Sequence, residues 1–192
     1  GVSAQTSVGT WKTYSSFSDV RKMVQTPQKV YFISGNYLYS YDKETEETYN
    51  YNSGNKLNDI VITDIYYNID GKYLLVTYSS GNIDLIYDDG EVVNMSDIKD
   101  AGLNYSTEIN DVAFGGDYIY VATKFGLIVY DEKKQEVKSS GVYGKEISLV
   151  TIVGDYVIID QNHSLYFLHK GGRFETFDNF SSNSESLAFS PS

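Results

Sequence analysis

Short apolar runs separated by polar turns follow one another along the chain. Val, Ile, Tyr and Phe gather in these runs and do not recur at the spacing of an amphipathic helix, so the runs favour strands. Gly, Asn and Asp, which tolerate positive φ in tight turns, separate the runs at residues 68–71, 88–90, 115–117 and 170–172. Only residues 18–24 and 95–101 resemble short helical turns, and we expect a helix at neither. The pattern therefore predicts antiparallel strands joined by hairpins.

Four segments of the chain share one plan. Each has a polar turn, an apolar strand, a small or polar turn and a second apolar strand, which usually ends in an acidic residue. The strand pairs fall at residues 29–33 with 37–42, 72–76 with 82–88, 117–121 with 126–131, and 155–159 with 164–168. The first strands of the pairs recur roughly every 40 residues, near Val30, Tyr73, Tyr118 and Tyr156, which is the period of a propeller blade.

Each repeat leaves room for two further strands, and residues 60–67, 91–93, 109–114 and 136–138 supply candidates. Four-stranded repeats of this length predict an all-β, β-propeller-like fold of about four antiparallel blades, which is a partial or small propeller. An irregular β-sandwich is the alternative, because its strands also recur at short intervals. We assign residues 1–10 to a disordered export leader, 11–180 to the propeller-like domain, and 181–192 to a tail or the start of a further blade.

Unpaired strand edges are the expected weakness of so small a propeller. Four blades is about the lower limit for closure, and an open arc leaves edges that invite association. We therefore expect either poor closure of the ring or a homodimer in which two copies cover each other's open blade edges. The strand around Trp11 and Tyr14 is expected to pair with a later blade.

The charge balance excludes several classes of partner. The formal net charge is −11 and the 15 Lys and Arg are scattered, which argues against nucleic acid, polyanions and anionic membrane surfaces. The chain has no Cys, so it has no disulfide and no thiol nucleophile. The sequence has no apolar run approaching the ~18 residues of a membrane helix, so we expect no membrane insertion. Val2, Ser3 and Ala4 before Gln5 resemble the end of a secretory signal peptide and favour export.

Candidate catalytic groups are few and lie in no catalytic motif. His163 falls in a turn and His169 at a strand end, where we expect both to face solvent. Four carboxylates lie inside apolar strands, namely Asp64, Asp84, Asp111 and Asp160. Two of them could form the catalytic pair of a glycosidase, or each could accept hydrogen bonds from turn amides. We favour the hydrogen-bonding role. The acidic turn at residues 88–91 lacks a full calcium loop. We predict that the chain is not an enzyme and has no catalytic residue, no cofactor and no metal site.

Tyrosine is the main candidate for ligand binding, since the chain has 19 of them. Rings near turns or on alternate strand faces suit stacking against a sugar or a partner protein. The candidates, which we expect to be exposed, are Tyr14, Tyr37, Tyr49, Tyr51, Tyr66, Tyr67, Tyr78 and Tyr143. Most tyrosines in a strand-rich chain serve as strand formers, so the ligand-binding residues stay unknown at this point.

Several stretches, in matching order from residue 11 to residue 144, resemble the N-terminal β-propeller of PorZ-type proteins and, more loosely, the regulator propellers of Bacteroidetes sensors. They are residues 55–59, 81–86, 94–99, 124–131, 136–138 and 143–144, together with Trp11 and Tyr14. Lys56 stands where the family tends to have glycine, and Ser139-Ser140 where it tends to have Asp-Thr. The family's propeller has more than four blades, so the resemblance implies an excised part, a truncated paralogue or a partial propeller.

The resemblance to PorZ implies a non-catalytic, exported binding or scaffold module linked to type IX secretion, in the periplasm or at the outer-membrane surface. The resemblance to the sensor propellers implies instead a periplasmic glycan-sensing domain of a two-component regulator. Neither resemblance brings a catalytic residue. The expected partner is a protein or a neutral glycan, because a chain with a charge of −11 repels anionic polymers over about 8 to 10 Å.

Overall fold

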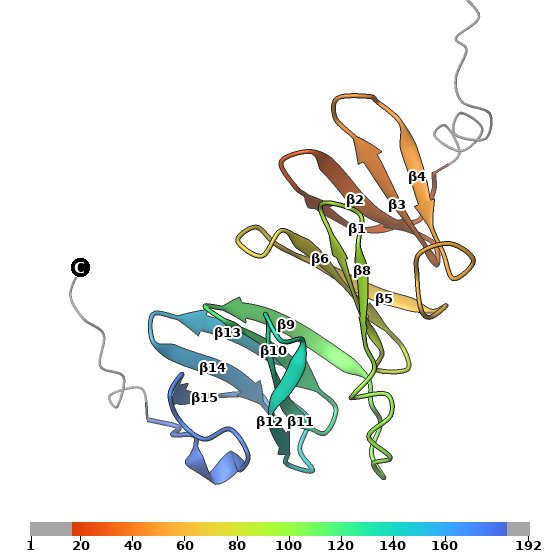
Figure 1. Cartoon of the computed structure of the whole chain (residues 1–192). Helices are drawn as coiled ribbons and strands as arrows, with labels where there is room; N and C mark the ends of the chain where they lie inside the picture. Colours follow the sequence, from red (N-terminus) through yellow and green to blue (C-terminus); the bar gives the residue numbers. More distant parts are fainter. Residues whose placement is uncertain (1–16, 184–192) are drawn as a thin grey trace, which may run out of the picture. The chain divides into compact units, whose positions relative to one another are not determined.

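A computed structural model describes residues 17–183 and contains fifteen β-strands and one 3-10 helix (Figure 1). The predicted leader and the strand around Trp11 and Tyr14 lie outside these residues, as does the tail from residue 184. The strands are β1 (Val20–Gln25), β2 (Lys29–Ser34), β3 (Tyr37–Asp42), β4 (Thr48–Tyr51), β5 (Ile62–Asn68), β6 (Tyr73–Tyr78), β7 (Ile83–Tyr87), β8 (Val92–Met95), β9 (Ile109–Gly115), β10 (Tyr118–Thr123), β11 (Gly126–Asp131), β12 (Glu136–Val142), β13 (Leu149–Val153), β14 (Tyr156–Gln161) and β15 (Ser164–His169). The all-β prediction is confirmed.

Within each sheet, strands that follow one another in the chain are hydrogen-bonded neighbours. They form three four-stranded sheets and one three-stranded sheet, which we name blade 1 (β1 to β4), blade 2 (β5 to β8), blade 3 (β9 to β12) and blade 4 (β13 to β15). Among the described strands, pairing stays within a blade. Four small consecutive sheets are typical of propeller blades, whereas a sandwich would join the strands into two sheets. The predicted blade-like fold is confirmed.

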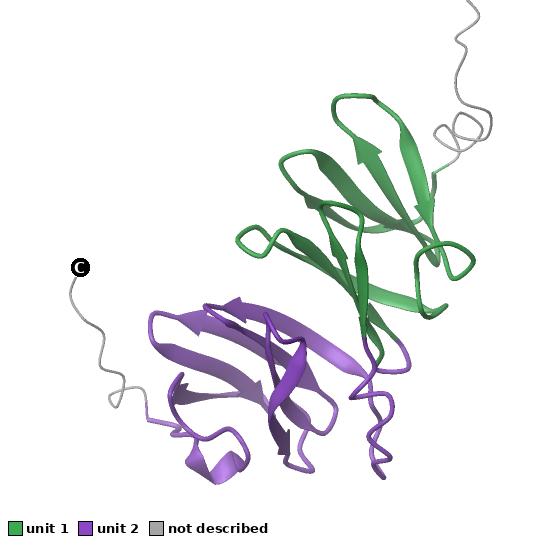
Figure 2. Ribbon diagram, viewed as in Figure 1, with its two compact units in different colours: residues 1–78, 82–94 green, residues 79–81, 95–192 purple. Residues whose placement is uncertain are grey.

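The chain divides into two compact units (Figure 2). Unit 1 comprises Gly1–Tyr78 and Asn82–Asn94, and unit 2 comprises Ser79–Gly81 and Met95–Ser192. Blades 1 and 2 therefore belong to unit 1, apart from the last residue of β8, and blades 3 and 4 belong to unit 2. The domain boundaries expected from the sequence stay predictions.

Each unit has its own apolar core between its two blades. In unit 1, Ile33 and Leu38 of blade 1 share a buried cluster with Ile65 and Leu74 of blade 2. In unit 2, the buried cluster joins blades 3 and 4 and also takes in the segment after β15: Tyr120, Ala122, Leu127, Val129, Ile147, Val150, Val157, Ile159, Phe174 and Phe180. Burying one such large side chain stabilises the fold by about 1.5 to 3 kcal/mol, so the blade-on-blade contacts hold each unit together.

The first strands of blades 1, 2 and 3 share a register shift, which lies next to Lys22, Asp64 and Asp111. A bulge redirects the side chain beside it. Within unit 1, Lys22 Nζ lies 3.2 Å from Asp64 Oδ1. Within unit 2, Asp111 Oδ2 accepts the N–H of Val150 on β13 at 3.0 Å. The shifts thus bring polar side chains to the neighbouring blade, where they supplement the apolar core.

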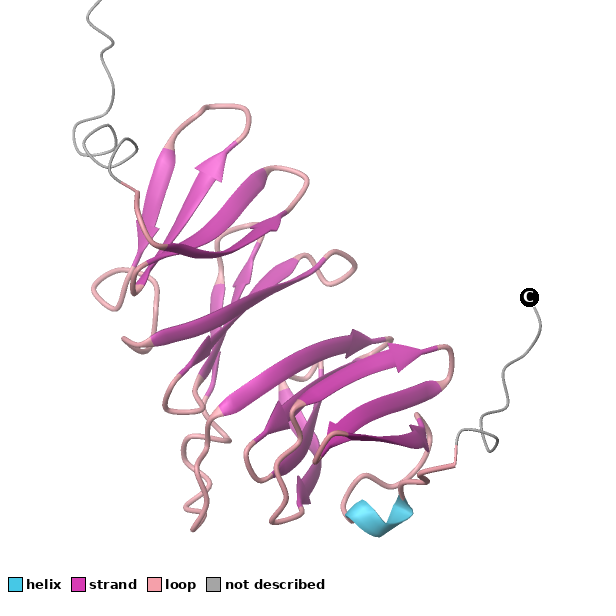
Figure 3. Cartoon of the chain, turned by 180° about the vertical axis from the view of Figure 1, so that it is seen from behind, coloured by secondary structure: helices cyan, strands magenta, loops and turns pink. Residues whose placement is uncertain are grey.

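The core hairpins lie where the sequence predicts them, but three other strands go beyond the prediction. These are β4, β13 and β1, and β1 occupies most of the segment that resembles a helical turn. Residues 95–101 form turns, and the one helix in the described part of the chain is η1 (Phe177–Asn179) (Figure 3). No helix within residues 17–183 has the length and apolar character needed to cross a bilayer.

Candidate functional site

Turns from both blades of unit 1 border two hollows. The first, of about 570 Å³, is lined by Pro27, Gln28, Tyr67, Ile69, Lys72, Asp88 and Asp89. The second, of about 400 Å³, is lined by Lys29, Ser40, Asp42, Thr45, Glu47, Thr48, Tyr49, Tyr51, Lys56 and Gly90. Consecutive residues contribute to both, 27–29 from blade 1 and 88–90 from blade 2, so the hollows adjoin. We call the two hollows together the hairpin groove.

Side-chain hydrogen bonds shape the turns on the blade 1 side of the groove. Thr26 Oγ1 accepts the N–H of Lys29 at 2.9 Å, which closes the turn between β1 and β2. Asp42 Oδ1 accepts the N–H groups of Thr45 at 3.0 Å and Glu44 at 2.9 Å, which closes the turn between β3 and β4. The backbone N–H of Thr45 and then that of Glu44 lower the pKa of Asp42 below its ordinary value. The acidic residue predicted at the end of a repeat's second strand is therefore a turn former.

Three tyrosines of the sequence prediction line the groove. The ring of Tyr49 is 43% exposed and packs edge to face on Tyr51, with ring centroids 4.7 Å apart. Tyr51 itself is buried, and Ser40 Oγ donates to its hydroxyl at 3.2 Å. Tyr67 donates to Asp88 Oδ2 at 2.9 Å, and burial, followed by this hydrogen bond, raises the pKa of Tyr67 to about 12. Tyr49 is thus the ring most open to a ligand, and Tyr67 is a neutral phenol at physiological pH.

Charges of both signs line the groove. Lys29, Lys56 and Lys72 supply cations, while Asp42, Glu47, Asp88 and Asp89 supply carboxylates. Lys56 Nζ donates to the carbonyl oxygen of Gly90 at 3.3 Å and so connects the segment before blade 2 with its last hairpin. An ammonium group has three donors, and a carboxylate accepts several hydrogen bonds. The groove therefore offers donors and acceptors beside an aromatic ring.

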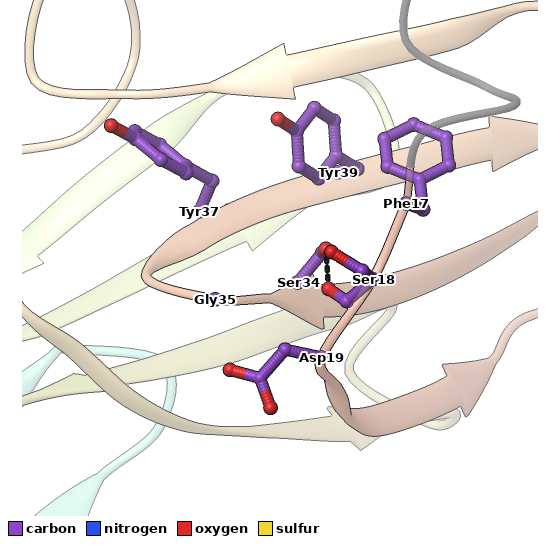
Figure 4. A pocket seen from close by; sticks show the side chains of 7 residues that line it. All are labelled: Phe17, Ser18, Asp19, Ser34, Gly35, Tyr37 and Tyr39. Atoms are coloured by element: carbon purple, nitrogen blue, oxygen red, sulfur yellow. Dashed lines mark hydrogen bonds between the residues drawn. The ribbon is translucent and has the colours of Figure 1, made fainter.

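Tyr37 lies on a different surface of blade 1. It lines a hollow of about 290 Å³ with Phe17, Ser18, Asp19, Ser34, Gly35 and Tyr39 (Figure 4). Tyr37 is 58% exposed. Phe17 packs edge to face on Tyr39 at 4.7 Å between ring centroids, and Ser34 Oγ donates to the carbonyl oxygen of Ser18. The sequence prediction of an exposed ring is confirmed at Tyr37 and Tyr49.

The remaining candidate tyrosines have structural contacts. Tyr78 is fully buried and donates to Asp84 Oδ2 at 2.6 Å, so its prediction as an exposed stacking ring is wrong, as is that of Tyr51. Tyr143 donates to the carbonyl oxygen of Phe174 at 2.6 Å, and burial raises the pKa of Tyr143. Tyr66 is partly buried and donates to Asp64 Oδ2 at 3.0 Å. Tyr14 lies outside the described residues.

Asp84 is a fully buried carboxylate with four donors around it. Its Oδ2 accepts the backbone N–H of Asn58 at 2.8 Å and the hydroxyl of Tyr78 at 2.6 Å. Its Oδ1 accepts the side-chain amides of Asn58 at 2.9 Å and Asn94 at 3.0 Å. A buried carboxylate is stable only when its lone pairs are satisfied, and here they are. The predicted role in holding turn amides is confirmed for Asp84.

The other three in-strand carboxylates also accept backbone N–H groups. Asp64 Oδ1 accepts from Ile65 at 2.8 Å and Asp111 Oδ1 accepts from Val112 at 2.9 Å. Asp160 Oδ1 accepts from His163 at 3.0 Å, at the start of the turn between β14 and β15. The predicted hydrogen bond to a turn amide is therefore confirmed for Asp160, whereas Asp64 and Asp111 accept N–H groups of their own strands.

Both histidines are exposed, as predicted, with His163 in the turn after β14 and His169 at the end of β15. Asn162 and His163 have positive φ angles of 52° and 65°, which the tight turn after β14 requires. His169 Nδ1 accepts the N–H of Gly171 at 3.0 Å. Within residues 17–183, no three His, Asp or Glu side chains gather in a way that would hold a metal ion. At the acidic turn, Asp89 Oδ1 accepts the N–H of Glu91 at 2.9 Å, so this carboxylate closes the turn.

Comparison with known proteins decides the family. The family model for the TSS9 PorZ N-terminal beta-propeller domain matches residues 30–179. The chain belongs to the PorZ N-terminal β-propeller family. This confirms the resemblance found in the sequence. No curated protein matches the chain.

Solved structures agree with the PorZ-family fold. PorZ of Porphyromonas gingivalis, described as an essential surface component of the type-IX secretion system, has a TM-score of 0.78 at 24% identity. The match covers 86% of this chain and 22% of PorZ, so the chain spans less than a quarter of that protein. The extracellular domain of a putative hybrid two component system from B. thetaiotaomicron has a TM-score of 0.63 at 17% identity, covering 79% of this chain and 21% of that one. The computationally designed Ika4 protein has a TM-score of 0.61 at 11% identity, covering 79% and 91%.

Sequence reasoning missed the lysines of the groove. Lys29 begins β2, while Lys56 and Lys72 lie in two separate turns, and the sequence does not show that these segments meet. One signal pointed to Lys56, because it departs from the glycine that the PorZ family tends to have there. The structure gives that departure a consequence, since it adds a cation to the groove.

Proposed function

We propose that the chain is a non-catalytic, exported binding domain of a surface protein, and that its hairpin groove holds a neutral sugar chain. Membership of the PorZ family supports the exported, surface-associated part of the proposal, because PorZ is described as a bacterial surface component of the type-IX secretion system. The periplasm or the outer-membrane surface is the corresponding location.

The choice of a sugar as the ligand rests on one observation, which is that the groove combines an exposed aromatic ring with side chains of both charges. Sugar rings stack on aromatic side chains through their C–H faces, while their hydroxyls both donate and accept hydrogen bonds. Tyr49 supplies the ring, with Lys29 and Lys56 as donors and Asp42 and Glu47 as acceptors. Two adjoining hollows also suit an extended chain better than a single small molecule.

Charge argues for a neutral glycan. The whole chain carries a formal charge of −11, and four of the seven charged side chains that line the groove are carboxylates. An anionic polymer would meet repulsion over a Debye length of about 8 to 10 Å. The lysines in the groove offset this only locally.

Calorimetric titration with a panel of neutral and anionic bacterial glycans tests the proposal. We expect a neutral member to bind more tightly than about 1 mM and anionic members to bind more weakly at low salt. If no glycan binds more tightly than millimolar, and a pulldown from an outer-membrane extract recovers one protein instead, the proposal of a glycan ligand is wrong and the groove is a protein-docking site.

A sensing role is the second candidate, because the fold also resembles the extracellular domain of a putative hybrid two component system. At 17% identity this likeness concerns the fold alone, so we rank sensing below surface binding. A membrane span and a kinase encoded after residue 192 would support sensing, whereas a secretion-type C-terminal domain would support the surface role.

A further inference from the structure

The turn that carries Lys56 is closed by hydrogen bonds of two asparagines. The carbonyl oxygen of Asn52 accepts the N–H groups of Asn55 and Lys56, each at 3.1 Å. The side-chain oxygen of Asn55 accepts the N–H of Asn52 at 2.9 Å, and its amide donates to the carbonyl oxygen of Asn50 at 2.9 Å. Asn50 belongs to β4, which also carries Tyr49. The backbone of Lys56 is therefore fixed beside the strand that supplies the exposed ring of the hairpin groove.

Gly90 is held by the hairpin between β7 and β8. Its N–H donates to the carbonyl oxygen of Tyr87 at 2.9 Å, and its φ of 94° lies in the left-handed region that favours glycine. Its carbonyl oxygen accepts from Lys56 Nζ at 3.3 Å. An ammonium group has three donors and a carbonyl oxygen has two lone pairs, so this contact leaves capacity on both groups. The hollow of about 400 Å³ thus presents a donor and an acceptor 3.3 Å apart, together with the ring of Tyr49.

Neighbouring hydroxyls of a sugar ring match this pair. A hydroxyl both donates and accepts, so one hydroxyl can accept from Lys56 while the next donates to the carbonyl oxygen of Gly90. Two hydroxyl oxygens that are gauche on neighbouring carbons have a spacing close to that of the Lys56–Gly90 contact. A carboxylate only accepts, so it would place an oxygen against the carbonyl oxygen, and an ammonium only donates, so it would place N–H groups against Lys56. The pair therefore favours a diol over either charged group.

We propose that Lys56 and the carbonyl oxygen of Gly90 select sugar residues that have two free hydroxyls on neighbouring carbons, which makes Lys56 a specificity-determining residue of the hairpin groove. This selectivity rests on the proposed function, because it names the class of sugar that the groove holds. Tyr49 stacks on the ring of the same sugar residue, since it lines the same hollow as the pair. Asp42 and Glu47, which also line this hollow, accept from the remaining hydroxyls. A linkage that occupies one hydroxyl of the diol removes the match.

Calorimetric titration of the full 192-residue chain with two matched pairs of neutral oligosaccharides tests the proposal. Every glucose residue of cellotetraose keeps a free diol, whereas the internal residues of laminaritetraose are linked through the 3-hydroxyl and have none. Mannotetraoses linked through the 6-hydroxyl and through the 3-hydroxyl form the second pair, which adds the cis diol of mannose. In at least one pair, the diol-bearing member should bind the wild type about tenfold more tightly, as for hydrogen bonds that involve a charged donor.

Lys56→Met removes the donor and keeps a side chain of similar length. It should bring the affinities for the two members of that pair within about twofold of each other. Lys43→Met is the matched control, because Lys43 Nζ also donates to a backbone carbonyl oxygen, that of Thr26 at 2.6 Å, but lines neither hollow of the groove. Both variants lose one positive charge, so a difference between them does not come from net charge. Lys43→Met should keep the wild-type ratio, and circular dichroism checks that both variants are folded.

The proposal is overturned if the wild type binds both members of each pair equally, or if it binds none of the four tetraoses. It is also overturned if Lys56→Met keeps the wild-type ratio, or if Lys43→Met lowers the ratio as much as Lys56→Met does. Equal binding of both members would leave the glycan proposal standing, because the groove would then hold a neutral sugar chain without selecting its linkage. The glycan proposal fails separately, when no neutral member of the wider panel binds.

Discussion

Asp84 of β7 accepts the backbone N–H of Asn58 at 2.8 Å, across 26 residues of sequence. Asn58 belongs to the connection between blades 1 and 2, and Lys56 of the groove lies two residues before it. The buried carboxylate therefore fixes the connection that carries one wall of the hairpin groove. Stability of unit 1 and the shape of the groove depend on the same side chain.

Asp84→Asn should destabilise the protein by about 3 kcal/mol. The amide NH₂ group replaces one of the two carboxylate oxygens, each of which accepts from two donors, so buried hydrogen bonds are lost whichever way the amide turns. Chemical denaturation measures the loss. Asp117→Asn is the control, because Asp117 is an exposed turn residue, and its change should stay within about 0.5 kcal/mol. Equal losses for the two variants would mean that Asp84 is not specially held.

Gly126→Ala should destabilise unit 2 by about 3 kcal/mol or more. A Cβ atom at this position would overlap the carbonyl oxygen of Gly141, on the paired strand β12, so the backbones would have to separate. Gly116→Ala provides the comparison. Gly116 has a φ of +59° and open space around its Cβ position, so only the backbone conformation costs energy there, about 1 kcal/mol. Thermal melting of both variants should rank Gly126→Ala as clearly the worse.

Stability should fall between pH 10 and pH 12. Burial, followed by the nearby Tyr118, raises the pKa of Tyr120 from 10.0 to about 12. A group with a raised folded-state pKa contributes stability that is complete below its unfolded pKa and is lost as the pH rises through the folded value. The loss attributable to Tyr120 is on the order of 2 kcal/mol. Tyr120→Phe should show a shallower decline in denaturation midpoint over this range, and an unchanged slope would contradict the assignment.

The sequence predicts the core hairpins because their branched and aromatic residues form continuous runs, as in β6 and β10. It does not predict β1, in which Arg21 and Lys22 interrupt the apolar pattern, because one face of that strand is exposed. It also misses β4, which has only four residues. These strands form because neighbouring strands of the same blade supply hydrogen-bond partners. The local sequence of a strand does not reveal such partners.

The sequence predicts the tyrosine rings of the hairpin groove but not its charged side chains. Tyr49 and Tyr67 stand out from the sequence as tyrosines near turns, but so does Tyr78, which the structure buries against Asp84. Burial of a strand tyrosine depends on which face meets the next blade, and periodicity alone does not reveal this where both faces are apolar, as in β6. The meeting of turns from two blades likewise depends on tertiary packing.

Titration of the neutral glycan with Tyr49→Ala and Tyr105→Ala tests the central claim most directly. Tyr49 and Tyr105 are 43% and 48% exposed, but only Tyr49 lines the hairpin groove. If the groove is the binding site, Tyr49→Ala should weaken affinity by about 1 to 3 kcal/mol, as loss of a stacking ring does, while Tyr105→Ala leaves it unchanged. Equal affinity of Tyr49→Ala and the wild type, with both folded, would contradict the account.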